Sequence, residues 1–155
     1  MQQASVKTTS ASAGGPLPSV RQLLTVAALV EWLAGLGLVL APGAVVALLL
    51  GVAPDLGGLM IGRVAGVALL ALGVACWGAR ADLGGAAWAG TLAAITVYNA
   101  GAGLLLLLFA VTGKASGVGV WGAGVLHLVL ATGFAATLQR PGDPSPGRLR
   151  QRRSG

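Results

Sequence analysis

Residues 26–40 of the chain read VAALVEWLAGLGLVL, an apolar run that contains one carboxylate, Glu31. Counted from Arg21 to Leu40, the segment has about 20 residues, the length an α-helix needs to cross a hydrocarbon core about 30 Å thick. It therefore predicts a membrane-spanning helix. It also raises the question of what compensates the charge of Glu31.

Three further apolar segments of similar length follow, at residues 58–77, 86–111 and 118–138. Lipid offers no hydrogen-bond partners to open strand edges, and four segments are too few to close a barrel, so helices are expected. Residues 43–53 (GAVVALLLGVA) are too short to span and predict a half-helix at the membrane surface, begun near Pro42 and ended by Pro54. Residues 21–139 thus predict an all-α integral membrane four-helix bundle with a short interfacial half-helix after the first span.

The composition supports this class of protein. Hydrophobic residues make up 55% of the chain and charged residues only 9%, whereas a soluble domain carries about 25% charged residues. The mean hydropathy is +0.85. Residues 1–20 are rich in Ser, Thr, Ala and Gly, and residues 140–155 are interrupted by prolines, so both segments are predicted to be disordered tails.

The net charge of +6 is concentrated at the C-terminus, where residues 140–155 hold five of the ten basic residues. Such a tail favours anionic lipid headgroups, at about 1 kcal/mol per basic residue. No basic patch with interleaved aromatic residues is present, which argues against nucleic-acid binding. Basic residues precede the first span (Lys7 and Arg21), follow the second (Arg80) and follow the fourth, so the positive-inside rule predicts that both termini are cytoplasmic.

Each predicted span carries a conspicuous polar group at an estimated depth between the midplane and the outer third of the membrane. These groups are Glu31 in the first span, Arg63 in the second, Tyr98 and Asn99 in the third, and His127 in the fourth. Small residues three and four positions away place them on or beside helix-packing faces. We therefore expect one buried polar cluster, in which Arg63 pairs with Glu31 and offsets the cost, about 2.5–3.5 kcal/mol, of a lone charge inside the membrane.

Two roles for this cluster are open. It can hold the four helices in register, or it can line a pocket for a ligand or a proton. The series Gly58, Gly62 and Gly66 in the second span predicts close helix packing in either case.

No catalytic motif is recognisable. The chain has one cysteine, Cys76, and one histidine, His127, so an intrachain disulfide is excluded and no metal site is predicted. The sequence thus favours a protein that is not an enzyme, and its motifs predict no cofactor.

Several segments together resemble a known family. They read VEWLAGLGLVLAP, LLLG, IGRVAGVALLALGVACWGAR, VYNAGAG and VLHLVLA. Between Leu23 and Leu138 the chain resembles small bacterial four-helix membrane proteins and, more remotely, the DoxX-like superfamily. The resemblance implies a multi-pass protein of the bacterial cytoplasmic (inner) membrane, and it implies architecture more than activity. Some DoxX-like proteins are associated with sulfur or quinone redox chemistry, although the single Cys76 argues against a thiol-based version.

The sequence favours a structural, accessory or assembly partner in the membrane, as a homodimer or within a larger complex. The alternative is a redox or quinone-binding subunit that uses the buried polar cluster, since a quinone site needs hydrogen-bond donors and a group that delivers protons. A transporter or proton channel ranks last, because the two halves show no inverted repeat.

Overall fold

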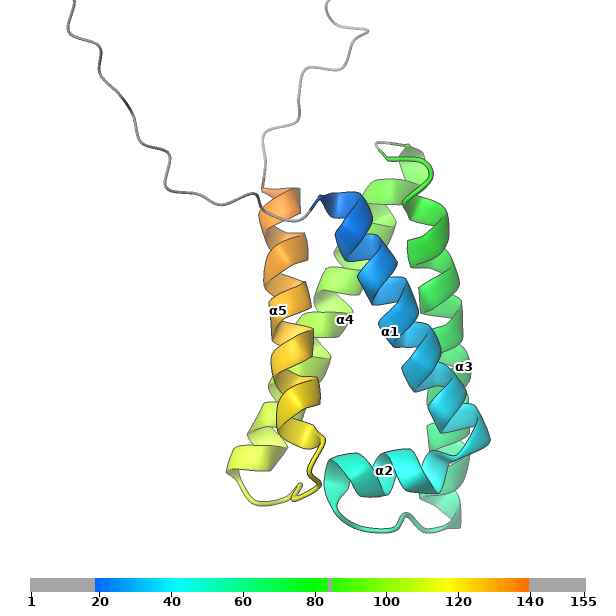
Figure 1. The fold of residues 1–155 in the computed structure, drawn as a ribbon, viewed down its shortest axis with the longest axis vertical. Coiled ribbons are helices and arrows are strands. Elements are labelled where there is room, and N and C mark those ends of the chain that lie inside the picture. Colours follow the sequence, from blue (N-terminus) through cyan, green and yellow to red (C-terminus); the bar gives the residue numbers. More distant parts are fainter. Residues whose placement is uncertain (1–18, 84, 140–155) are drawn as a thin grey trace, which may run out of the picture.

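The computed structural model describes residues 19–83 and 85–139, and the predicted tails at residues 1–18 and 140–155 lie outside this range. The described chain forms five α-helices, arranged as shown in Figure 1. They are α1 (Val20–Leu40), α2 (Pro42–Leu50), α3 (Leu56–Ala79), α4 (Ala86–Val111) and α5 (Val120–Leu138).

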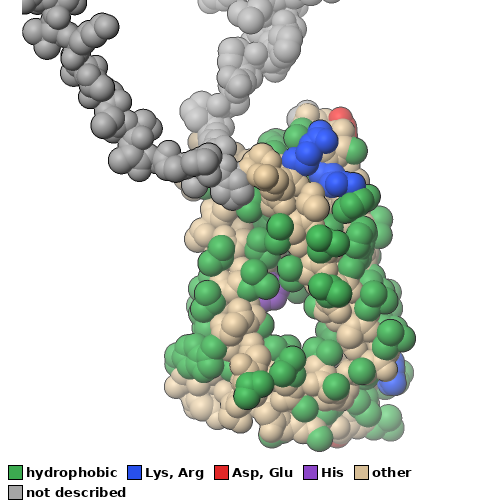
Figure 2. Space-filling model, viewed as in Figure 1, with side chains coloured by type: hydrophobic (Ala, Val, Ile, Leu, Met, Phe, Trp, Pro, Cys, Tyr) green, Lys and Arg blue, Asp and Glu red, His purple; other side chains and the backbone are tan. Residues whose placement is uncertain are grey.

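Four of these helices are long and apolar enough to cross a membrane, namely α1, α3, α5 and residues Trp88–Val111 of α4. Large apolar side chains cover much of the outer surface (Figure 2), among them Leu33, Ile61 and Val97. A surface of this kind is suited to lipid rather than to water. The predicted membrane four-helix bundle with an additional short helix is therefore confirmed.

The helix ends follow from local chemistry. Ser19 and Gln22 form a capping box at the start of α1, and the Asp55 side chain accepts a hydrogen bond of 2.7 Å from the Gly58 amide at the start of α3. These caps satisfy amide groups that the first helical turn leaves unpaired. The short helix α2 begins at Pro42 and ends at Gly51, whose φ of 79° is left-handed, a conformation that favours glycine.

The long helices form two antiparallel pairs, α1 with α3 and α4 with α5. The pairs lie close together at the end where α1 begins and α5 ends, and they diverge toward the opposite end (Figure 1). Nine residues of the core cluster, including Leu24, Ile95 and Phe134, fill the closed end. The divergence leaves the other half of the bundle with much less side-chain packing between the pairs.

The short helix α2 runs across the open end, crosswise to the spans (Figure 1). Its last carbonyl groups accept hydrogen bonds from the loop between α4 and α5: Ser116 N donates to Leu50 O at 3.1 Å, and Gly119 N donates to Leu48 O at 3.0 Å. Because α2 also follows directly from α1, it connects the two helix pairs and holds them apart at this end.

Glycines allow the close contact within the α1–α3 pair. A Cβ on Gly66 would lie 2.8 Å from the Gly35 carbonyl oxygen, and a Cβ on Gly62 would lie 3.2 Å from Pro42 Cβ. Gly58 differs, since its nearest neighbours are Pro54 and Asp55 in the loop that precedes its own helix. Of the three glycines predicted to pack helices, Gly66 therefore lies at the close α1–α3 contact. Gly62 packs against Pro42 at the start of α2 and only loosely against Leu38 of α1, and Gly58 contacts neither helix.

Candidate functional site

A hydrogen bond between α4 and α5 forms the centre of the polar cluster. His127 Nδ1 lies 2.8 Å from Asn99 Oδ1, and Asn99 Nδ2 donates to the Ile95 carbonyl at 2.9 Å. An amide oxygen can only accept, so the proton of this bond belongs to His127 Nδ1. The Ile95 carbonyl orients the amide, and the amide in turn determines which nitrogen of the imidazole is protonated.

Tyr98 extends the cluster across the bundle. Its ring meets the His127 ring edge-on, with centroids 5.5 Å apart and planes at 85°. Its hydroxyl lies toward the carboxyl group of Glu31 on α1, although neither Glu31 oxygen has a hydrogen-bond partner within the described chain. Tyr98 is thus the residue of the α4–α5 pair that faces Glu31.

Glu31 is completely buried. Within the described chain, neither of its carboxyl oxygens has a hydrogen-bond partner. Ala27 and Ala28 of the same helix belong to the apolar core cluster, and Tyr98 packs against that cluster. The carboxyl group of Glu31 is thus buried next to the apolar core.

The predicted pairing of Arg63 with Glu31 is wrong. Arg63 is exposed on α3, and among the described residues Glu31 has no cationic partner. The contacts of Gly35 with Gly66 and of Ala28 with Gly73 set the register of the two helices. In that register Glu31 is level with Leu70, so Arg63 lies seven residues away, about 10 Å along the axis.

Below the polar cluster lies a cavity of about 520 Å³, lined by residues from all five helices. This volume is typical of small-molecule sites, which are about 300–1,000 Å³. Among the described lining residues only Tyr98 and His127 have polar side chains, and the others are leucine, valine or alanine. The cavity is therefore apolar with one polar end.

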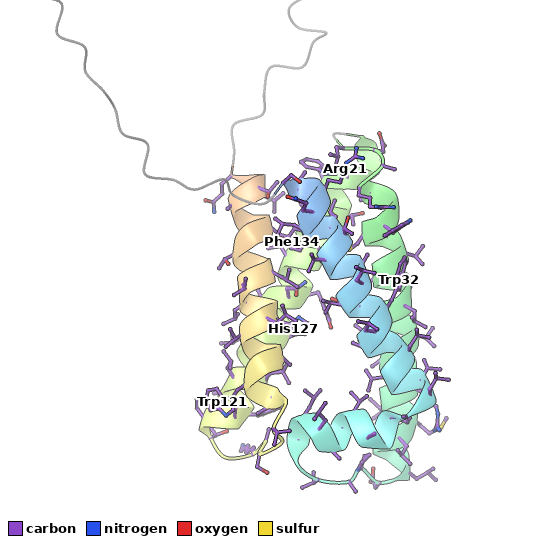
Figure 3. The ribbon with its side chains drawn as sticks, in the orientation of Figure 1. Arg21, Trp32, Trp121, His127 and Phe134 are labelled. Atoms are coloured by element: carbon purple, nitrogen blue, oxygen red, sulfur yellow. The ribbon has the colours of Figure 1, made fainter. Side chains whose placement is uncertain are left out.

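The cavity opens to the side. Figure 2 shows it as an opening through the bundle, with His127 at its edge. In Figure 3, His127 lies on the side of α5 that faces this interior. The opening is framed by the apolar spans and by α2, whose lining residues are also apolar. An entrance between apolar spans is suited to hydrocarbon rather than to water.

Side chain size and the position of α2 explain the empty space. Ala34, Ala102 and Ala123 line it from α1, α4 and α5, where larger residues would fill it. Leu48 and Leu49 of α2 form part of the lining at the open end. The sequence left a pocket beside the polar cluster open as one of two roles, but it did not indicate the size of the cavity or the part that α2 plays in its lining. The local signal was the set of small residues one helical turn from the polar groups, namely Ala34, Ala102 and Ala123.

Within residues 19–83 and 85–139, no group of three His, Cys, Asp or Glu side chains is arranged to hold a metal ion. Comparisons with known family models, with curated proteins and with solved structures find no match for this chain. The fold and the cavity alone thus define its class: a four-span α-helical membrane protein with an apolar cavity that is open to the bilayer and polar at one end.

Proposed function

We propose that this protein binds a membrane-soluble amphiphile in the cavity between its two helix pairs. The observation that carries the proposal is the combination of an apolar cavity of about 520 Å³ with a polar end formed by Tyr98 and His127. An amphiphile would place its chain among the leucines and its headgroup beside these two side chains. It would enter from the bilayer through the lateral opening.

A quinone is one amphiphile of this kind, and it remains the specific alternative suggested by the resemblance to DoxX-like proteins. The resemblance itself remains a proposal. The assignment to a bacterial inner membrane with cytoplasmic termini also remains a proposal. The structure bears on one part of it: α1 begins at the same end of the bundle at which α5 ends (Figure 1), as expected if both ends of the bundle's chain face the same side of the membrane.

The test compares two alanines of α4 that differ in position. Ala102 lines the cavity, whereas Ala100 is exposed on the outer surface. In Ala102→Phe the added ring should fill part of the cavity, and in Ala100→Phe it should extend into lipid. After purification in nanodiscs, extraction and mass spectrometry should find an amphiphile retained by the parent chain and by Ala100→Phe but lost from Ala102→Phe.

Two results would contradict ligand binding in this cavity. One is equal retention of the amphiphile by Ala102→Phe and Ala100→Phe. The other is that the parent chain retains no amphiphile and also binds no added long-chain probe. Thermal unfolding of both variants serves as the control for folding. Filling a cavity with an apolar side chain should not lower the midpoint if the ring fits the space.

Association with another membrane helix is a second candidate function, as the sequence favoured. Gly90 and Gly101 are eleven residues apart on α4, which places them on the same face, and both are exposed with no neighbour within 4 Å of an added Cβ. Small residues on one face let membrane helices approach closely.

Crosslinking in nanodiscs or native vesicles tests this second candidate. Gly101→Leu should reduce a homodimer or a complex with another chain if this face is the contact. Gly122→Leu on α5 is the matched control, because Gly122 is also exposed and also has open space around it. The assignment of this face would be contradicted if the parent chain forms no crosslinked species. It would also be contradicted if Gly101→Leu and Gly122→Leu reduce crosslinking equally.

A further inference from the structure

We infer that the headgroup of the bound amphiphile carries a hydroxyl group, which donates a hydrogen bond to Nε2 of His127. This inference rests on the proposed function, because it specifies the ligand class of the same cavity. It follows from the way in which three residues of α4 and α5 determine the protonation of one imidazole ring.

The first step is the assignment of the ring proton. Asn99 Nδ2 is used by the Ile95 carbonyl, so Oδ1 faces His127. The opposite orientation of the amide would place its oxygen against the Ile95 carbonyl oxygen, and two acceptors repel each other. In the neutral ring Nδ1 is therefore the donor, and Nε2 carries a lone pair that can only accept.

The second step is the absence of an internal donor for that lone pair. No described residue donates a hydrogen bond to Nε2, although His127 lines the cavity. The only other polar side chain among the described lining residues is Tyr98, which packs its ring against the His127 ring and makes no hydrogen bond to it. The cavity thus presents an imidazole acceptor for which residues 19–83 and 85–139 supply no donor.

The third step concerns the ligand. A hydroxyl headgroup supplies the missing donor, as in a long-chain alcohol or a quinol. A headgroup with acceptors alone, such as an ether, an ester or the carbonyl of an oxidised quinone, would place a lone pair against the lone pair of Nε2. The structure therefore selects hydroxyl-bearing amphiphiles over otherwise similar molecules that cannot donate.

The experiment uses the fact that the chain contains a single histidine. The full chain is produced with ¹⁵N-labelled histidine and without a histidine tag, and it is reconstituted in nanodiscs near neutral pH. Imidazole ¹⁵N NMR then distinguishes a protonated ring nitrogen from an unprotonated one. In the free protein we expect Nδ1 to be protonated and Nε2 to be unprotonated.

Dodecanol and dodecyl methyl ether are the probes, since they share the chain length and differ in the donor. Dodecanol should shift the Nε2 resonance, and it should bind about three- to tenfold more tightly than the ether, the range expected for one neutral hydrogen bond. Affinity is measured from the thermal unfolding midpoint at increasing probe content of the bilayer. His127→Phe should abolish the preference for dodecanol while both probes still bind, and His127→Leu is the alternative variant if the phenyl ring destabilises the bundle.

The outcomes separate the two proposals. If both probes stabilise the protein equally and neither shifts Nε2, the cavity binds amphiphiles but the hydroxyl requirement is wrong. A free protein with Nε2 protonated would overturn the inference in the same way. If neither probe affects the unfolding midpoint or the imidazole resonances, ligand binding in the cavity is itself contradicted.

Discussion

Gly35 of α1 and Gly66 of α3 lie with their backbones in direct contact: a Cβ on either residue would come within 2.8 Å of the carbonyl oxygen of the other. This contact sets the register of the α1–α3 pair. It thereby determines which side chains of α3 are level with Glu31.

Gly66→Ala should destabilise the bundle by about 1–3 kcal/mol, because the new methyl group meets backbone that cannot move without shifting a helix. The free energy of unfolding can be measured by titration with a denaturing detergent. Gly78→Ala is the matched control on the same helix, since nothing lies within 4 Å of an added Cβ there. Equal effects at the two positions would show that the α1–α3 contact is looser than in this structure.

Glu31 and Arg63 should behave independently in a double-mutant cycle. No cation of the described helices and loops lies beside Glu31, and Arg63 is exposed, so Arg63→Gln should change stability by no more than about 0.5 kcal/mol. The coupling energy between Glu31→Gln and Arg63→Gln should stay below about 0.5 kcal/mol, as for distant sites. A double variant more stable than Glu31→Gln alone would indicate an ion pair that this structure lacks.

The bond between Asn99 and His127 should show measurable coupling. Asn99→Leu leaves the imidazole N–H without its acceptor at a partly buried site, which costs about 1–3 kcal/mol. When His127→Phe is added, the unpaired group is removed, so part of the lost stability should return. Simple additivity of the two losses in the unfolding titration would mean that the hydrogen bond contributes nothing to the α4–α5 contact.

The tie between α2 and the loop before α5 should depend on Gly117. A Cβ on this residue would collide with the Leu48 carbonyl group, so Gly117→Ala should displace the loop from α2 and lower the unfolding midpoint. Gly113→Ala is the comparison: φ is 70° but there is open space around the residue, so only local backbone strain is added, about 1 kcal/mol. If Gly117→Ala lowers the unfolding midpoint less than Gly113→Ala does, the contact between α2 and the α4–α5 loop does not hold the cavity open.

Much of the architecture follows from the sequence because it depends on local properties. The length and apolarity of four segments require membrane-spanning helices, and the short run after Pro42 cannot span. The helical repeat also places Glu31 and Asn99 on inward faces, and both are completely buried. These conclusions need no knowledge of how one helix is placed against another.

The tertiary structure alone decided which inward groups meet. Depth estimated from the span ends placed Arg63 near Glu31, but the backbone contact of Gly35 with Gly66 shifts the helices so that Arg63 lies elsewhere. Likewise, the cavity exists because α2 is tied to a loop more than sixty residues later, through Ser116 and Gly119. Helix register and the angle between helix pairs arise from contacts between distant segments, and these contacts leave no periodic signal in any single helix.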